Sequence, residues 1–84
     1  MMHFSSYISN LRASYIKMLS IAREEFSLVD EGLFHTGTSY DDYLQFFIGD
    51  YSTGIVEVTI SQNGEIFPNS IHIYRDGHWS RYNK

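Results

Sequence analysis

The last third of the chain contains two dipeptides, Asn63-Gly64 and Asp76-Gly77, that favour tight two-residue turns between antiparallel strands. In a type I′ turn both central residues have positive φ, which Asn, Asp and Gly adopt most easily. Each dipeptide lies between stretches rich in β-branched and aromatic residues. The sequence therefore predicts two hairpins, and each two-residue turn would also fix which residues lie opposite one another.

Side-chain alternation in the same region favours strands. Val56 and Val58 alternate with Glu57 and Thr59, which is typical of a strand with one buried face. Pro68 has no backbone N–H and interrupts the return strand, so we expect a bulge or an edge position there. The expected strand segments are residues 55–61, 66–67, 71–74 and 78–82.

The N-terminal part of the chain has the apolar periodicity of a helix. Between residues 6 and 29, apolar side chains recur every three or four positions, which places them on one stripe. Ser5 or Ser6 can cap the start of this helix, and Gly32 can end it. The stripe consists of Ile8, Leu11, Tyr15, Met18, Leu19, Ala22, Phe26 and Val29.

Two segments between the helix and the hairpins give weaker signals. Residues 33–39 are rich in turn formers, so we expect a connection there. Residues 40–48 fit either a short capped helix or a strand. We favour the strand, because the loop from Gly49 to Gly54 then joins it to the next strand as a hairpin.

These elements predict an α+β fold in which one long N-terminal helix packs on a three- to four-stranded antiparallel β-meander, as a single domain over residues 1–84. The chain has no cysteine, which excludes a disulfide scaffold and a cysteine-based zinc site. We see neither a signal peptide nor an apolar run long enough to span a bilayer. We therefore expect a cytoplasmic protein that binds no membrane.

Charge is segregated along the chain. The formal net charge is −4, but residues 1–23 carry +3, residues 24–74 carry −9 without any Lys or Arg, and residues 75–84 carry +2. Two interpretations stay open: an acidic surface that keeps the protein soluble, or an acidic face that docks a basic partner. Direct binding of nucleic acid is disfavoured, because phosphate contacts need clustered Lys and Arg.

The turn at Asp76-Gly77 sets the expected register of the last hairpin. It pairs Tyr74 with Trp79 and His72 with Arg81. Trp, Tyr and Arg are the residue types most frequent at binding hot spots, although a stabilising cross-strand aromatic pair is the alternative interpretation. The face away from the helix is expected to carry Glu57, Thr59, His72, Tyr74, Trp79 and Arg81. The face toward the helix is expected to carry Val56, Val58, Ile60, Phe67, Ile71, Ile73 and Tyr82.

Acids lie beside tyrosines in the middle third of the chain, around residues 40–43 and 49–51. Carboxylates pair with Arg or Lys, and Tyr adds contact area at low entropic cost, so this pattern is typical of a surface that meets a basic partner. A solvated loop with tyrosines packed beneath it is the alternative. The candidate partner-binding residues are Tyr40, Asp41, Asp42, Tyr43, Asp50, Tyr51, Glu57, His72, Tyr74, Trp79 and Arg81.

The sequence contains no recognisable catalytic or metal-binding motif. The four histidines form no HExxH pattern, and the glycines form no phosphate-binding motif. We therefore expect no enzyme activity, no cofactor and no metal. One alternative is a small enzyme or ligand-binding domain that uses His72, Glu57 and Arg81 on the open sheet face as base, carboxylate and anion stabiliser. Another is a self-associating structural protein, with a homodimer formed through the sheet face or the strand edge near Pro68.

A small, acidic, cysteine-free domain is similar in class to the bacterial immunity proteins that neutralise basic nuclease toxins, and to phage proteins that block nucleic-acid-binding enzymes. The similarity rests on size and charge. It implies a non-enzymatic protein-binding module, a small acidic inhibitor or immunity-type protein that binds and neutralises a basic protein such as a nuclease toxin. The residues at the centre of such contacts would be Asp41, Asp42, Asp50 and Glu57, with Trp79 and Tyr74 as a second patch.

Overall fold

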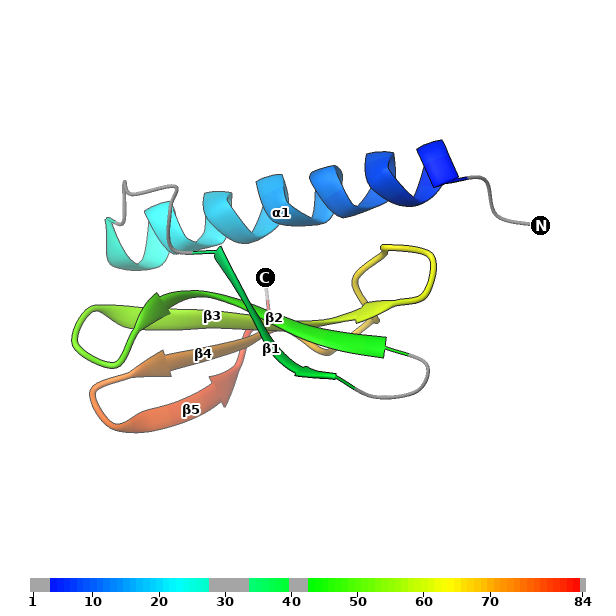
Figure 1. Ribbon diagram of the computed structural model, residues 1–84. Coiled ribbons are helices and arrows are strands. Elements are labelled where there is room, and N and C mark those ends of the chain that lie inside the picture. The colour runs from blue at the N-terminus through cyan, green and yellow to red at the C-terminus, as the bar shows by residue number, and fades with distance from the viewer. Residues whose placement is uncertain (1–3, 28–33, 40–42, 84) are drawn as a thin grey trace.

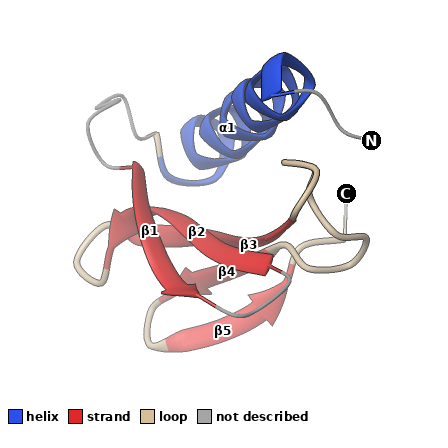
Figure 2. Ribbon diagram, turned by 45° about the vertical axis from the view of Figure 1, so that its right-hand side comes forward, coloured by secondary structure: helices blue, strands red, loops and turns tan. Residues whose placement is uncertain are grey.

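The computed structural model describes residues 4–27, 34–39 and 43–83. One helix lies across one face of a five-stranded antiparallel sheet, in which the strands follow their sequence order (Figure 1). Figure 2 shows the same two layers from a second direction. The elements are α1 (Phe4–Phe26), β1 (Phe34–Ser39), β2 (Tyr43–Asp50), β3 (Gly54–Ser61), β4 (His72–Arg75) and β5 (His78–Arg81).

The expected α+β class and the antiparallel meander are confirmed, but the sheet has one strand more than expected. The extra strand is β1, which occupies the stretch that we expected to be a connection. Its backbone pairs with β2 from Phe34 opposite Ile48 to Ser39 opposite Leu44, with an irregular register between Thr36 and Ser39. Pairing with a neighbouring strand thus overrides the turn-forming composition of this segment.

Helix α1 ends earlier than the apolar stripe suggests. Ser27 has a φ of 56° and donates its backbone N–H to the carbonyl of Arg23, which closes the last turn with a left-handed residue. The proposed end at Gly32 lies outside the described residues. The described part of the chain contains no helix that is both long and apolar enough to cross a membrane.

The core lies between α1 and the sheet. The buried apolar side chains of α1 are Met18, Leu19, Ile21 and Ala22, and those of the sheet layer include Phe46, Ile48, Val56, Val58, Ile60, Ile71 and Ile73. The alternation predicted for β3 is confirmed, since Val56, Val58 and Ile60 are all buried. Tyr82 packs against the edge of this core, as expected.

The hairpin at Asp76-Gly77 has the predicted geometry. Both turn residues have positive φ, 52° and 85°. The register pairs Arg75 with His78, Tyr74 with Trp79, Ile73 with Ser80 and His72 with Arg81. A two-residue turn therefore fixes the facing of every residue in this hairpin, as the sequence indicated.

The turn at Asn63-Gly64 differs from the prediction. Only Gly64 has positive φ, and Ser61 exchanges backbone hydrogen bonds with Gly64 and Glu65, so the loop has three residues rather than two. Ile66 rather than Phe67 then lies opposite Ile60, and the predicted direction of Phe67 is wrong. Ile66 packs against the core, whereas Phe67 is 39% exposed. The Ser61 hydroxyl accepts from the Asn63 N–H, which supports this wider loop.

Helix α1 is attached to the sheet layer through its N-terminal half and at its C-terminal end. Toward its N-terminus, the Ser14 hydroxyl donates a buried hydrogen bond of 2.8 Å to the Gly64 carbonyl, and Asn10 donates to the carbonyl of Asn63. At its C-terminus, Arg75 forms a 2.7 Å ion pair with Glu25 and lies 5.0 Å from the centre of the Phe26 ring. The helix therefore has a fixed orientation over the sheet, and the opposite face stays uncovered by it.

We expect Gly64→Ala to lower the free energy of unfolding by about 2–5 kcal/mol, because it combines a left-handed backbone with overpacking. A Cβ at this position would lie 2.7 Å from the Tyr7 carbonyl oxygen and 3.1 Å from the Leu11 amide nitrogen. The measurement is urea denaturation followed by circular dichroism.

Gly77→Ala is the matched control, because Gly77 has nearly the same φ as Gly64, 85° against 84°, but has nothing within 4 Å of the added Cβ. It should cost only the backbone strain, about 1–2 kcal/mol. Equal losses in the two variants would show that the contact between the Gly64 loop and α1 does not stabilise the fold.

Candidate functional site

The sheet face away from α1, hereafter the open face, carries a row of polar side chains. Glu57 of β3 lies opposite His72 of β4, and His72 lies opposite Arg81 of β5. Directly paired residues on antiparallel strands point to the same side, with Cβ atoms about 4.5–5.5 Å apart. The structure thus places the three residues side by side. The pairing of His72 with Arg81 is the register predicted from the sequence, whereas the pairing of Glu57 with His72 adds to the prediction that both lie on this face.

Three aromatic side chains form a continuous chain beside this row. Tyr74 contacts Tyr51 edge-to-face with ring centres 4.9 Å apart, and Trp79 with ring centres 5.3 Å apart. Tyr51 is 72% exposed and Trp79 is 46% exposed. Ile55 is the register partner of Tyr74 and is only 4% exposed, although it is not part of the core beneath α1. The aromatic chain (Tyr51, Tyr74, Trp79) therefore lies beside one buried apolar residue of its own face and still presents two rings to solvent.

An open hollow of about 400 Å³ lies where the polar row meets the aromatic chain, and it is lined by Glu57, His72 and Trp79. The imidazole ring of His72 is oriented by a hydrogen bond, since its Nδ1 is 3.0 Å from the carbonyl oxygen of Ser70. A carbonyl oxygen can only accept, so Nδ1 carries the proton in the neutral ring and Nε2 keeps its lone pair. His72 is thus oriented with one nitrogen available as an acceptor or base.

A bulge between β3 and β4 positions that carbonyl. Residues 68–70, which begin with Pro68, leave the ladder with β3, as the sequence indicated, and Asn69 has a φ of 63°. The Ser70 hydroxyl replaces backbone hydrogen bonds that the bulge removes from the ladder. It accepts from the Thr59 N–H at 3.2 Å and donates to the Thr59 carbonyl at 3.4 Å. These hydrogen bonds fix the bulge to β3. Because the bulge carries the Ser70 carbonyl, they also fix the position of the His72 ring.

A second aromatic contact joins Tyr43 and Phe67, whose rings meet edge-to-face with centres 5.9 Å apart. Both side chains are partly exposed, 36% and 39%. Tyr43 is among the candidates that the sequence predicts, whereas the sequence predicts Phe67 on the face toward the helix, which is wrong. The signal that would have identified Phe67 is the three-residue loop at Gly64, which shifts the register by one position.

Asp50 has a local structural role. Its carboxylate accepts hydrogen bonds from the backbone N–H groups of Ser52 and Thr53 and from the Ser52 hydroxyl, at 3.0, 2.8 and 2.7 Å. The side-chain hydrogen bond from Ser52 and the bonds from Thr53 lower the pKa of Asp50 below its ordinary value of 3.8. The carboxylate is exposed to solvent while it organises the loop between β2 and β3.

The predicted acidic and tyrosine residues do not form one group. Tyr40, Asp41 and Asp42 lie outside the described residues. Tyr43 and Asp50 stand at opposite ends of β2, which spans about 24 Å at the usual rise per residue. Asp50 pairs with Gly54, which faces α1, whereas Glu57 is on the open face. Of the candidates, the structure brings together Tyr51, Glu57, His72, Tyr74, Trp79 and Arg81.

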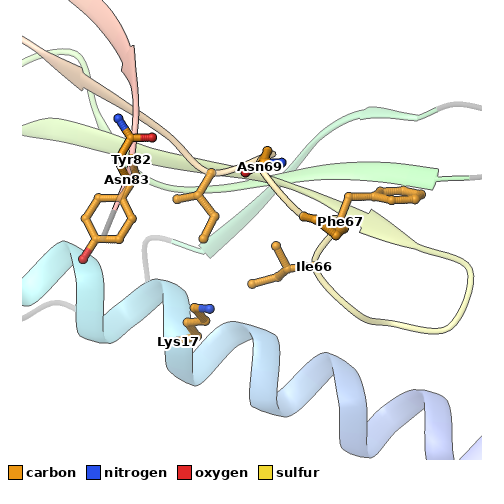
Figure 3. Close-up of a pocket in the computed structure, with 8 residues that line it drawn as sticks. Lys17, Ile66, Phe67, Asn69, Tyr82 and Asn83 are labelled. Atoms are coloured by element: carbon orange, nitrogen blue, oxygen red, sulfur yellow. The ribbon is translucent and has the colours of Figure 1, made fainter.

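A separate cavity of about 300 Å³ lies between α1 and the two stretches that follow β3 and β5 (Figure 3). Lys17 rises from the helix on one side, and Tyr82 and Asn83 lie on the other. The rest of its wall consists of Ile66, Phe67, Pro68, Asn69 and Ile71. Sequence reasoning missed this cavity, because it depends on how the bulge and the C-terminal residues approach the helix.

Among the described residues, no group of three or more His, Asp or Glu side chains is placed to hold a metal ion. Comparisons of the chain with protein-family models, with known proteins and with solved structures find no match.

We expect Asp50→Ala to destabilise the protein at neutral pH, with a deficit that shrinks as the pH falls. A carboxylate whose pKa is lowered by folding stabilises the native state above its ordinary pKa of 3.8, and this contribution is lost as the pH falls through the folded pKa. Urea denaturation of both proteins at neutral pH and at a pH of about 2.5 measures the difference. The same deficit at both pH values would rule out the assigned role.

The neutral ring of His72 should populate the Nδ1–H tautomer, which is the minor form of free histidine. Long-range ¹H–¹⁵N correlation spectra of the neutral ring distinguish the two tautomers. His78 is the internal control, because it is exposed and no hydrogen bond to its ring is observed among the described residues. If His72 shows the same tautomer as His78, the Ser70 carbonyl does not orient the ring.

Proposed function

We propose that this protein is a non-enzymatic protein-binding module that contacts its partner through the open face. The proposal follows the expectation of a small acidic inhibitor or immunity-type protein that neutralises a basic protein, such as a nuclease toxin or a nucleic-acid-binding enzyme. The observation that carries it is the aromatic chain of Tyr51, Tyr74 and Trp79, two of whose rings, Tyr51 and Trp79, remain exposed on a face that α1 does not cover.

The exposure of aromatic rings to water is unfavourable in free energy, and burial of these rings against a partner would remove this unfavourable contribution. Binding hot spots are enriched in Trp, Tyr and Arg and tend to cluster, with less important polar contacts around them. The aromatic chain has such a composition, and Arg81 and Glu57 lie beside it in the polar row. Tyr74 is held on both sides by rings, so little side-chain entropy is lost on binding.

The charge of the chain favours a basic partner. The net charge is −4, and residues 24–74 contain no Lys or Arg. An excess of one sign raises the association rate with a partner of the opposite sign, over a screening distance of about 10 Å at 0.1 M salt. Asp50 and Glu57 are described members of this acidic segment, and both are accessible at the surface.

A second candidate function is the recognition of a small ligand at the hollow lined by Glu57, His72 and Trp79. The specific observation in its favour is the oriented imidazole of His72, whose register partner on β3 is Glu57. With Arg81 on the other side of His72, the row contains a base, a carboxylate and a cation. The hollow is open rather than enclosed, which is why we place protein binding first.

The test is site-specific photocrosslinking in the native cell. Tyr51 is replaced by benzoylphenylalanine, which keeps an aromatic ring on the open face. The matched control carries the same group at Ile16, which is 58% exposed on α1. We expect a discrete adduct with a basic protein from position 51 and none from position 16. In the purified complex, Trp79→Ala should then weaken binding by about tenfold or more, as for a hot-spot residue.

Several outcomes would contradict the proposal. An adduct from position 16 and none from position 51 would place the partner on α1 instead. An acidic partner, or binding that does not weaken as the salt concentration is raised, would contradict the claim that charge attracts the partner. Circular dichroism of Trp79→Ala and of the milder Trp79→Phe separates loss of the contact from loss of the fold.

A further inference from the structure

Strand β5 forms an uncovered edge of the sheet. It is the last strand in the sheet order, and all four of its residues are exposed. In Figure 1 it lies on the side of the sheet farthest from α1. Neither Pro nor a bulge interrupts it, whereas the opposite edge strand, β1, has an irregular register. A regular, exposed edge presents backbone groups that another strand can pair with.

The hairpin register shows which backbone groups of β5 point outward. The Tyr82 N–H donates to the Ile71 carbonyl at 2.9 Å, so residues 71 and 82 form a hydrogen-bonded pair. Hydrogen-bonded and non-bonded pairs alternate along an antiparallel ladder, which makes Ile73–Ser80 the next bonded pair. The N–H and C=O groups of Trp79 and Arg81 therefore point away from β4, toward the free edge.

We propose that β5 pairs with β5 of a second copy of this chain, antiparallel, about a two-fold axis at Ser80. In this register Trp79 lies opposite Arg81 of the second copy, and Arg81 lies opposite Trp79 of the second copy. Both are outward-pointing positions, so the two pairs form four backbone hydrogen bonds and leave none of these groups unpaired. Ser80 meets its own symmetry mate in a non-bonded pair, where the small exposed side chain fits. The inference is independent of the proposed function.

The side chains of β5 favour a second copy over an unrelated strand. Trp79 and Arg81 are both exposed and both on the open face, and the two-fold axis places each indole against a guanidinium. Such cation–π pairs are energetically favourable, and they are self-complementary only when the same strand is used twice. Among the described residues no ion pair of Arg81 is observed within the chain, so its guanidinium is available. The two sheets would join into one continuous sheet with both open faces on the same side.

The absence of cysteine allows a direct test. Across the proposed axis, a Cys at position 80 would face its mate with Cα atoms about 4.5 Å apart, within the range of a disulfide. In a glutathione redox buffer, Ser80→Cys should form a disulfide-linked dimer at least about tenfold faster than His78→Cys. His78 is the matched control, since it is exposed on the same strand but would be about 14 Å from its mate.

Sedimentation of the protein without introduced cysteine provides the second measurement. The wild type should show a mass that rises from monomer to dimer with concentration, and Ser80→Lys should stay monomeric, because it places two like charges in the closest pair. Position 80 is exposed, so neither substitution removes a core contact. A wild-type monomer at all concentrations would overturn the proposal, and so would equal crosslinking rates at positions 78 and 80. A stable dimer of Ser80→Lys would place the second copy on another surface.

Discussion

A sheet has two faces, and this chain has one described helix to cover them. The core therefore forms between α1 and one side of the sheet, where Val56, Val58 and Ile60 of β3 are buried. On the opposite side, side chains pack only in smaller local groups. The aromatic chain beside Ile55 is one of them, and the Glu57–His72–Arg81 row is the polar part of the same face. The candidate site exists because the helix cannot cover both faces.

That arrangement requires the helix to stay in one place. Its two attachments are of different kinds. At one end the Gly64 loop approaches the helix backbone so closely that a single methyl group would be too large, and Ser14 donates to it from within the interface. At the other end Arg75 links the β4–β5 hairpin to Glu25 and Phe26. The same hairpin thus holds the helix with Arg75 and presents Tyr74 and Trp79 on the other face.

The proposed surfaces share this hairpin but use different parts of it. The open face presents side chains, and the β5 edge presents backbone groups. A partner on the open face would contact Tyr51, Tyr74 and Trp79, whereas a second copy would pair along β5 and meet Trp79 only from the side. Trp79 is common to both, so substitutions there test the two surfaces together, and Tyr51 and Ser80 separate them.

Much of the fold and part of the site were predictable from the sequence, and the exceptions have a physical explanation. The Asp76-Gly77 turn is a local device, so its register, and with it the Tyr74–Trp79 and His72–Arg81 pairs, followed from the sequence. Strand β1 was missed because its composition favours a connection and only pairing with β2 makes it a strand.

The Asn63-Gly64 turn shows where sequence reasoning ends. Its two residues favour a type I′ turn, but the Ser61 hydroxyl and the Ser14 and Asn10 side chains of α1 hold a three-residue loop instead. This change moves Ile66 into the core and Phe67 out beside Tyr43. By itself, the sequence determined the helix, the meander and the last hairpin, because these depend on neighbouring residues. The tertiary structure alone decided the register beside Gly64, because Asn10 and Ser14 of the distant helix hold that loop. It also decided the position of the His72 ring, because the neighbouring Ser70 is placed by its hydrogen bonds to Thr59 of β3.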